Sequence, residues 1–153
     1  MAATALDEVH TMILAVFIAA LTFVLSGALH YVIVSGAIRH LGAASYHQGR
    51  KLVAALCVSG IAHIAVIGLY TLAYWAGRAA GIGDLSGDAT ATSIDVFYFS
   101  LVTYTSLGLG DIVPTGHLRL IAGIEALNGF LLISCSAAML FLFMRDQDAA
   151  DGS

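Results

Sequence analysis

Three long apolar segments dominate the pattern of hydrophobic and polar positions along the chain. They cover residues 11–38, 52–76 and 118–144, and each exceeds the roughly 20 apolar residues that a helix needs to cross a bilayer. Between the last two, the stretch 77–93 is rich in Gly, Ala, Asp, Ser and Thr, and the stretch 93–105 is aromatic and β-branched. The pattern predicts three transmembrane helices, an exposed and mobile linker, and one further short element.

The short 93–105 element is open to two interpretations. Its aromatic and β-branched side chains favour a strand by propensity. We expect a helix instead, because Ser93 suits an N-cap and Asp95 would lie in the first turn, near the positive end of the helix dipole. The element is too short to cross a membrane, so it must be re-entrant if the loop that follows it lies at membrane depth.

Composition agrees with a membrane protein of one domain. Of the 153 residues, 59% are hydrophobic and 10% are charged, whereas soluble domains carry about 25% charged residues. The net charge of −4 gives no reason to expect a nucleic-acid partner. We therefore expect an all-α membrane protein, with membrane lipid among its partners.

The basic residues set the expected orientation. Four lie between the first two crossings or after the third, and two lie on the other side: Arg39, Arg50, Lys51 and Arg145 against Arg78 and Arg119. Because cytoplasmic loops carry the excess of Lys and Arg, the N-terminus should be outside and the C-terminus cytoplasmic. We expect a multi-pass protein of the plasma membrane, in a bacterium the inner membrane.

The loop after the short element carries the chemistry that we expect of this chain. It places a hydroxyl, two alternating glycines, a carboxylate and a proline in order: Ser106, Gly108, Gly110, Asp111 and Pro114. Glycine adopts positive φ at little cost, so the alternation lets successive carbonyls point to one side. Several such segments around an axis would form rings of oxygens that replace the hydration shell of a cation. An ordinary external turn is the alternative.

The stretch 98–114 resembles the pore helix and selectivity filter of the potassium channel pore-domain family, whose filter reads Thr-Val-Gly-Tyr-Gly-Asp. The matching residues here are Ser106, Leu107, Gly108, Leu109, Gly110 and Asp111, preceded by the hydroxyl residue Thr105. The resemblance continues in the third crossing through Arg119, Glu125 and Gly129. It covers about a third of the chain.

The resemblance implies a homotetramer that conducts potassium, with permeant K⁺ ions in place of a cofactor. The ion-binding filter residues would be 105–110, starting with Thr105, with K⁺ at 106–110 and Asp111 at the outer mouth. The pore domain would span 52–144, with an outer helix 52–76, a pore helix 93–105, a filter 106–111 and an inner helix 118–144. Residues 1–51 would add a tail, an extra helix and a cytoplasmic loop, and 145–153 a short cytoplasmic tail.

Two departures from the family pattern leave other functions open. Leu109 stands where the family usually has Tyr or Phe and cannot hydrogen-bond to the pore helix, and Ser106 lacks the methyl group that stiffens Thr. A weakly selective channel for monovalent cations is therefore one alternative. A non-conducting membrane subunit is another. We do not expect an enzyme, because no spacing of nucleophile and base or of metal ligands supports one.

Polar residues within the third crossing are functional candidates, because they are costly in a membrane. We expect Glu125 to support the filter by accepting hydrogen bonds from Thr103 or Thr105, and a direct role in ion binding is the alternative. Asn128 or Leu132 should face the cavity below the filter. Gly129 is either a hinge of the inner helix or a point of close helix packing.

The first crossing is an addition to the minimal pore. It lacks the row of spaced arginines that a voltage sensor needs, so we expect it to pack peripherally and to shield the pore helices from lipid. His30 in this crossing and His63 in the second could form an interhelical hydrogen bond. Metal binding or proton sensing by such a pair is the alternative.

Overall fold

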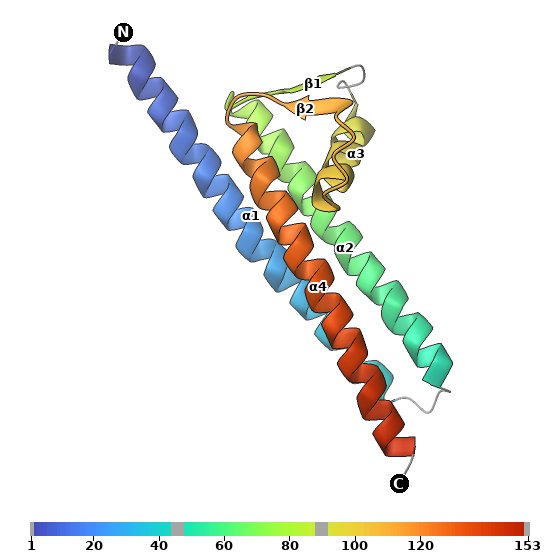
Figure 1. The fold of residues 1–153 in the computed structure, drawn as a ribbon. Coiled ribbons are helices and arrows are strands. Elements are labelled where there is room, and N and C mark those ends of the chain that lie inside the picture. Colours follow the sequence, from blue (N-terminus) through green and yellow to red (C-terminus); the bar gives the residue numbers. More distant parts are fainter. Residues whose placement is uncertain (1, 44–47, 88–91, 152–153) are drawn as a thin grey trace.

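The computed structural model describes residues 2–43, 48–87 and 92–151, and the stretch 44–47 of the expected cytoplasmic loop lies outside them. The elements in order are α1 (Ala2–Ala43), α2 (Gln48–Ala79), β1 (Leu85–Gly87), α3 (Ser93–Tyr104), β2 (Ile112–Pro114) and α4 (Leu118–Asp151) (Figure 1). The long helices extend past the apolar segments. The reason is that hydropathy marks only the part suited to lipid, while the flanking Ala, Arg, Asp and Gln residues continue a helix into water.

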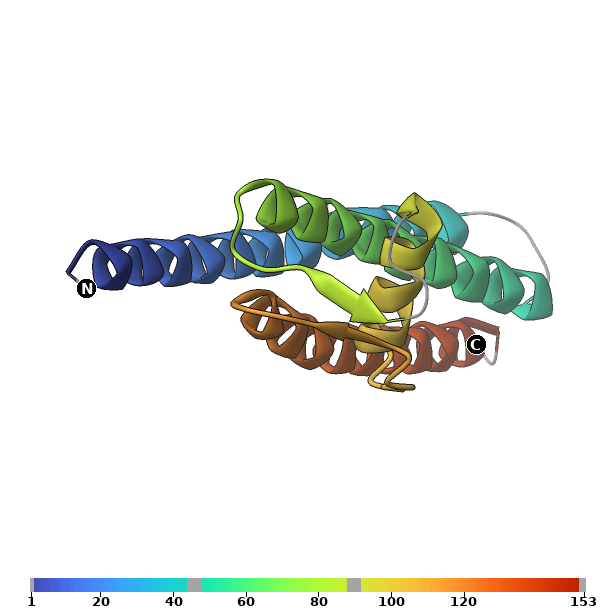
Figure 2. The same ribbon diagram turned by 90° about the horizontal axis from the view of Figure 1, so that it is seen from above.

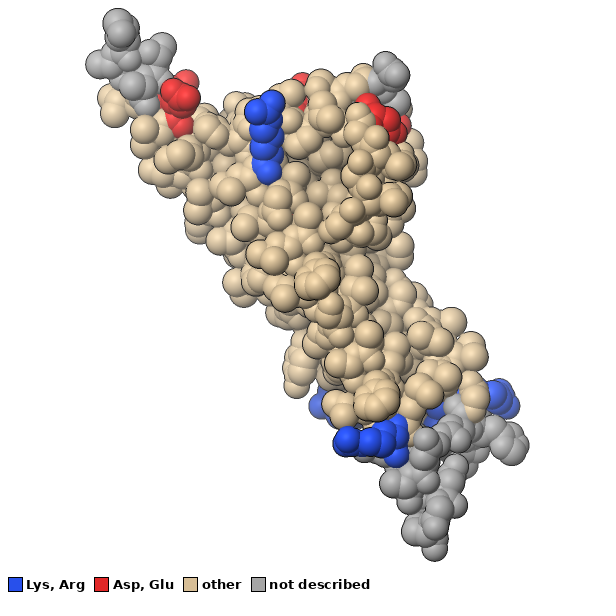
Figure 3. All heavy atoms as spheres, in the orientation of Figure 1, with Lys and Arg blue, Asp and Glu red and all other residues tan. Residues whose placement is uncertain are grey.

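Three helices are long and apolar enough to cross a membrane: Leu6–Leu41, Gly49–Ala79 and Leu118–Arg145. Large apolar side chains such as Phe17, Val32 and Phe141 are exposed on them. On the face drawn in Figure 3, charged side chains gather toward the two ends of the molecule and the surface between them carries none. The chain is therefore an all-α, multi-pass membrane protein.

The helix α3 lies between α2 and α4 at the end that carries the strands, which we call the hairpin end (Figure 2). The first helix, α1, packs against both α2 and α4 on their other side. Small residues fill these contacts: Ala15 and Ala19 of α1 and Ala62 of α2 are buried. Small side chains let helix backbones approach closely in a membrane.

The hairpin end is more ordered than the sequence suggested. Instead of a mobile linker, residues 77–87 continue α2 and form β1, which pairs antiparallel with β2 in the register Leu85↔Pro114, Ser86↔Val113 and Gly87↔Ile112. Arg78 Nε lies 2.6 Å from Asp84 Oδ1, and the amide of Thr115 donates to the Asp84 carbonyl at 2.7 Å. Ile82 and Leu85 are buried and hold this segment against the core, although most of its other residues are small or polar. The expectation of mobility is wrong for 77–87, and 88–91 lie outside the described residues.

The N-cap of α3 is Thr92, and not Ser93 as we expected. Thr92 Oγ1 accepts the Asp95 amide, and Asp95 Oδ2 accepts the Thr92 amide at 3.0 Å, which completes a capping box. The reciprocal pair satisfies two amides that the first turn would otherwise leave free. The sequence spacing Thr92…Asp95 carried this signal, because Asp occupies the third helical position.

We predict that Thr92→Ala lowers the stability of the protein in detergent by about 1 kcal/mol, the usual cost of removing a Thr N-cap. Thermal unfolding followed by circular dichroism measures the effect. Ser93→Ala is the matched control, since Ser93 is the first residue of α3 and not its cap, and it should leave the unfolding temperature unchanged. Equal losses from both variants would contradict the assignment of the cap.

Candidate functional site

The site begins where α3 ends against α4. A Cβ atom placed on Gly129 would collide with the carbonyl oxygen of Tyr104, so the two backbones are in direct contact. Gly129 lies about 16 Å along α4 from Leu118 at the usual helical rise. That distance is about half of the roughly 30 Å hydrocarbon core of a bilayer. From this point the chain returns to β2 at the hairpin end through residues 105–111, which we call the glycine loop (Figure 1).

Every second residue of the glycine loop has a left-handed backbone. The φ angles are 57° at Ser106, 57° at Gly108 and 78° at Gly110, whereas Leu107 and Leu109 do not have positive φ. Such alternation cancels the usual reversal of successive peptide planes, so neighbouring carbonyls can align along one edge. The loop is exposed throughout, and the side chains of Leu107 and Leu109 are 63% and 59% exposed.

Ser106 is a part of this geometry that sequence reasoning missed. Its amide donates to the Thr103 carbonyl at 2.9 Å, and the Leu107 amide donates to the Val102 carbonyl at 3.0 Å. These two bonds form a Schellman cap, in which the residue after the helix takes the left-handed conformation and is usually Gly. A residue with a Cβ pays roughly 1–2 kcal/mol for that conformation. No glycine marked the position, so the sequence held no signal for it.

The end of the glycine loop next to β2 is linked to α3 by a side-chain hydrogen bond. The Tyr98 hydroxyl donates to Asp111 Oδ2 at 2.8 Å, and both residues lie at the surface. This bond to the carboxylate raises the pKa of Tyr98 above its ordinary value. Asp111 is exposed where the glycine loop meets β2.

Glu125 is fully buried and joins three helices. Its Oε2 accepts the hydroxyl of Tyr74 from α2, and its Oε1 accepts the hydroxyl of Ser100 from α3 at 2.5 Å. Ser100 also lies within 3.0 Å of the Ile67 carbonyl. The carboxylate therefore fixes the position of α3 between α2 and α4.

The donors to Glu125 differ from the expected Thr103 or Thr105. Thr105 Oγ1 donates to the Leu101 carbonyl at 2.9 Å, within its own helix, and Thr103 receives the Ser106 amide through its carbonyl. The reason is helical register. Tyr104 is level with Gly129, so the residue one turn earlier on α3, Ser100, is level with the residue one turn earlier on α4, Glu125.

Asn128 does not face a cavity. It is buried, and its Nδ2 donates to Ser26 Oγ of α1 and to the Tyr70 hydroxyl of α2 at 2.9 Å. Leu132 is partly buried and packs on the core. A different face of α4 borders the glycine loop and lines a hollow of about 230 Å³, with the residues Tyr104, Thr105, Ser106, Phe130, Ile133 and Ser134. Sequence reasoning missed this because the partners of Asn128 lie on two other helices, α1 and α2.

The structure brings His30 and His63 together. Their ring centroids are 5.0 Å apart, and both Nε2 atoms lie within hydrogen-bonding distance of Ser136 Oγ, at 2.7 Å and 3.1 Å. They thus meet through a serine of α4 and do not bond to one another directly. Within the described residues, no group of three His, Cys, Asp or Glu side chains is placed to hold a metal ion.

We predict that Glu125→Gln destabilises the protein by about 1–3 kcal/mol, because one of the two buried hydroxyls loses its acceptor. The measurement is the shift in thermal unfolding temperature in detergent. Glu8→Gln, at an exposed position of α1, is the control and should unfold as the wild type does. An unchanged unfolding temperature for Glu125→Gln would rule out the bracing role.

We predict that Gly129→Ala lowers stability by about 1–3 kcal/mol, because overpacking forces the end of α3 away from α4. Gly123→Ala is the matched control on the same helix, since a Cβ there meets no atom within 4 Å. It should be neutral or slightly stabilising, because Ala favours a helix over Gly. Indistinguishable unfolding of the two variants would count against the close contact.

Comparison with known proteins places the chain in a family. Neither the curated proteins nor the solved structures contain a match to it. A family model described as "Ion channel" matches residues 63–146, which is more than half of the chain and extends from the middle of α2 to the end of the third apolar span. The match includes α3, the glycine loop and α4, and the chain belongs to this ion channel family.

Proposed function

We propose that the chain forms a potassium-selective pore from four copies, with the carbonyls of the glycine loop as the ion-binding groups. The observation that carries the proposal is the left-handed backbone at Ser106, Gly108 and Gly110. Together with the intervening residues, it allows five successive peptide units to offer oxygens along one edge. Rings of backbone carbonyls can replace the hydration shell of K⁺.

Assembly of several copies follows from what one copy lacks. A single glycine loop offers oxygens from one direction only, whereas a dehydrated cation needs them on all sides. The surface around the loop is also apolar and unpaired in one chain: Leu107, Leu109, Phe130 and Ile133 are all exposed. A fourfold arrangement, as the resemblance implies, would enclose the loop and bury part of this surface.

The environment of the loop favours a cation. The α3 helix ends at its inner side, where the partial negative charge of the helix dipole lies. Asp111 places a carboxylate at the other side. Non-helical backbone at membrane depth is tolerated where it is buried in protein or lines a water-filled path, and we infer that α3 and the glycine loop form a re-entrant pore element of this kind.

We infer an orientation with the hairpin end outside the cell, in the plasma membrane. Most of the basic side chains visible in Figure 3 gather at the opposite end, which would be cytoplasmic by the positive-inside rule. The N-terminus is then outside and the C-terminus inside. Asp111 would face the external solution, where it attracts incoming cations.

A weakly selective cation channel is the second candidate, and Leu109 is the reason for it. Its side chain is exposed and apolar, so it forms no hydrogen bond that would hold the loop at a fixed diameter. Reversal potentials with potassium on one side and sodium on the other separate the two candidates. A value near zero favours the weakly selective channel, and a value near the potassium potential supports ours.

We predict that purified protein in liposomes mediates potassium flux and that Gly108→Asp abolishes it, because the side chain strains the backbone at φ 57° and blocks the carbonyl edge. Gly81→Asp is the matched control. Gly81 also has positive φ, at 70°, with open space around it, but it lies outside the glycine loop. It should retain flux.

Two results would overturn the proposal. One is the absence of flux from wild-type liposomes that contain folded protein, which would favour a non-conducting subunit. The other is native mass spectrometry that finds a monomer under conditions in which flux is measured.

A further inference from the structure

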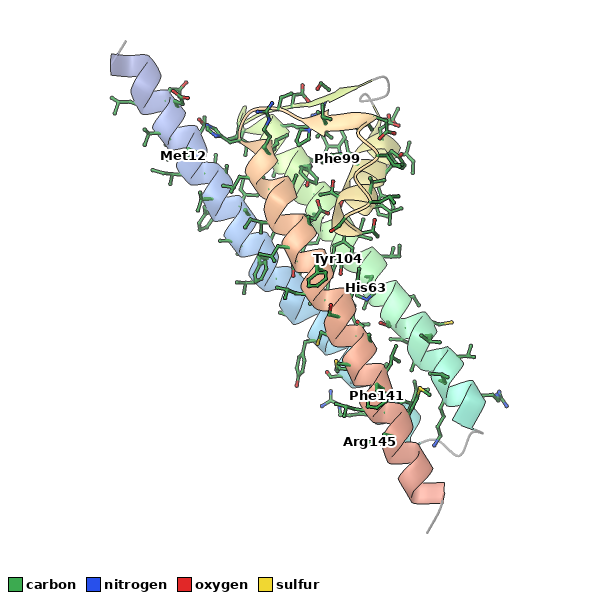
Figure 4. All side chains as sticks on the ribbon, in the orientation of Figure 1. Met12, His63, Phe99, Tyr104, Phe141 and Arg145 are labelled. Atoms are coloured by element: carbon green, nitrogen blue, oxygen red, sulfur yellow. The ribbon has the colours of Figure 1, made fainter. Side chains whose placement is uncertain are left out.

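Four side chains from four helices form one hydrogen-bonded chain next to the glycine loop, which we call the histidine relay. Three of them are buried, and His63 is partly buried. Tyr104 of α3 bonds His63 Nδ1 at 2.8 Å, His63 Nε2 bonds Ser136 Oγ of α4 at 3.1 Å, and Ser136 Oγ bonds His30 Nε2 of α1 at 2.7 Å. Figure 4 labels His63 and Tyr104 at the inner end of α3. The relay is the contact through which α1 reaches the base of the loop.

The neutral relay has one arrangement in which both hydroxyl groups donate. Tyr104 donates to His63 Nδ1, His63 Nε2–H donates to Ser136, and Ser136 donates to His30 Nε2. Each neutral imidazole then serves as one acceptor, and His63 also as one donor. In the reversed arrangement His63 donates to Tyr104, and the Tyr104 hydroxyl hydrogen has no place in the relay.

An added proton forces the reversal. If His63 takes the proton, both of its nitrogens donate and Tyr104 must accept. If His30 takes it, Ser136 must accept from His30 and donate to His63, which then donates from Nδ1 to Tyr104. In either case all three hydrogen bonds are kept only if Tyr104 accepts from His63. The Tyr104 hydroxyl hydrogen is then no longer donated to any member of the relay.

Tyr104 is placed to pass this change to the glycine loop. It is the last residue of α3, its ring is buried, and its carbonyl packs on Gly129. The next residue, Thr105, begins the loop. Tyr104 also lines the hollow that borders Thr105 and Ser106. A change in the bonding of Tyr104 therefore acts on the support of the loop.

We propose that His30 and His63 hold one excess proton between them, and that its capture reduces conduction by reversing the hydrogen bond of Tyr104 at the base of the glycine loop. The proposal rests on the proposed conduction through that loop. Only one proton is held at a time, because the two rings lie 5.0 Å apart and a charge on one opposes a charge on the other.

No carboxylate contacts the relay directly among the described residues, so no ion pair holds the proton there. Each bond of the relay joins histidine, serine and tyrosine side chains. The titratable groups outside the relay that act on it electrostatically are Tyr70 of α2 and Glu125 of α4, both through Tyr104, and each is bonded elsewhere. Glu125 lies about 16 Å from Ser136 along α4.

The test is potassium flux in proteoliposomes with equal pH on both sides, between about pH 8 and about pH 5, a range that brackets the ordinary histidine pKa. We expect a several-fold fall in wild-type flux on acidification. The double variant His30→Gln/His63→Gln should flatten this response, because glutamine does not titrate, whereas each single variant keeps one histidine that can take the proton. His117→Gln is the control, since His117 lies at the hairpin end outside the relay, and it should respond as the wild type does.

Nuclear magnetic resonance of ¹⁵N-histidine-labelled wild-type protein supplies a measurement that needs neither flux nor a stable variant. We expect the His30 and His63 signals to shift together and to report one shared proton. In Tyr104→Phe this titration should remain while the pH response of flux is lost.

The outcomes separate the two proposals. Three results would overturn the histidine relay as a proton site and leave conduction standing. They are wild-type flux that does not change with pH, a pH response that survives in the double variant His30→Gln/His63→Gln, and independent titration of the two rings. Absence of flux at every pH counts against the proposed function, and the shared titration then still decides whether the proton site exists.

Discussion

The contact between the Tyr104 carbonyl and Gly129 determines how far α3 extends along α4 before the chain turns back toward the hairpin end. One turn nearer the hairpin end, Ser100 and Glu125 repeat the same register as a hydrogen bond. These two levels, one of close packing and one of hydrogen bonding, hold α3 at a fixed height on α4. The position of the glycine loop along α4 follows from them.

The first helix is more than a lipid shield. Hydrophobic burial does not drive helix association in a bilayer, so small residues and polar side chains supply the specificity. The α1 helix uses both, through Ala15 and Ala19 on one part of its surface and Ser26 and His30 further along. Both polar residues bond to α4. The helix that the sequence presents as peripheral is thus bonded to the helix that borders the loop.

Features that depend on local composition could be predicted from the sequence. Apolar length indicated three spans, and the alternating glycines marked the position of the loop. The sequence was insufficient where the answer depends on which turn of one helix meets which turn of another. The donor to Glu125 is Ser100 and not Thr103, a difference of about one helical turn. Asn128 bonds to residues of α1 and α2 and does not face a cavity. Periodicity within one helix carries no information on such registers.

Ser106 belongs to two structures at once, the cap that ends α3 and the first left-handed position of the glycine loop. A helix can usually gain or lose a residue at its end and let the adjoining loop absorb the difference. The end of α3 has no such freedom, because Glu125 holds Ser100 one turn before it. The alternation of left-handed residues in the glycine loop also starts at Ser106. An insertion or deletion between Ser100 and Ser106 would shift the alternation by one residue and turn alternate carbonyl oxygens away from the proposed ion path.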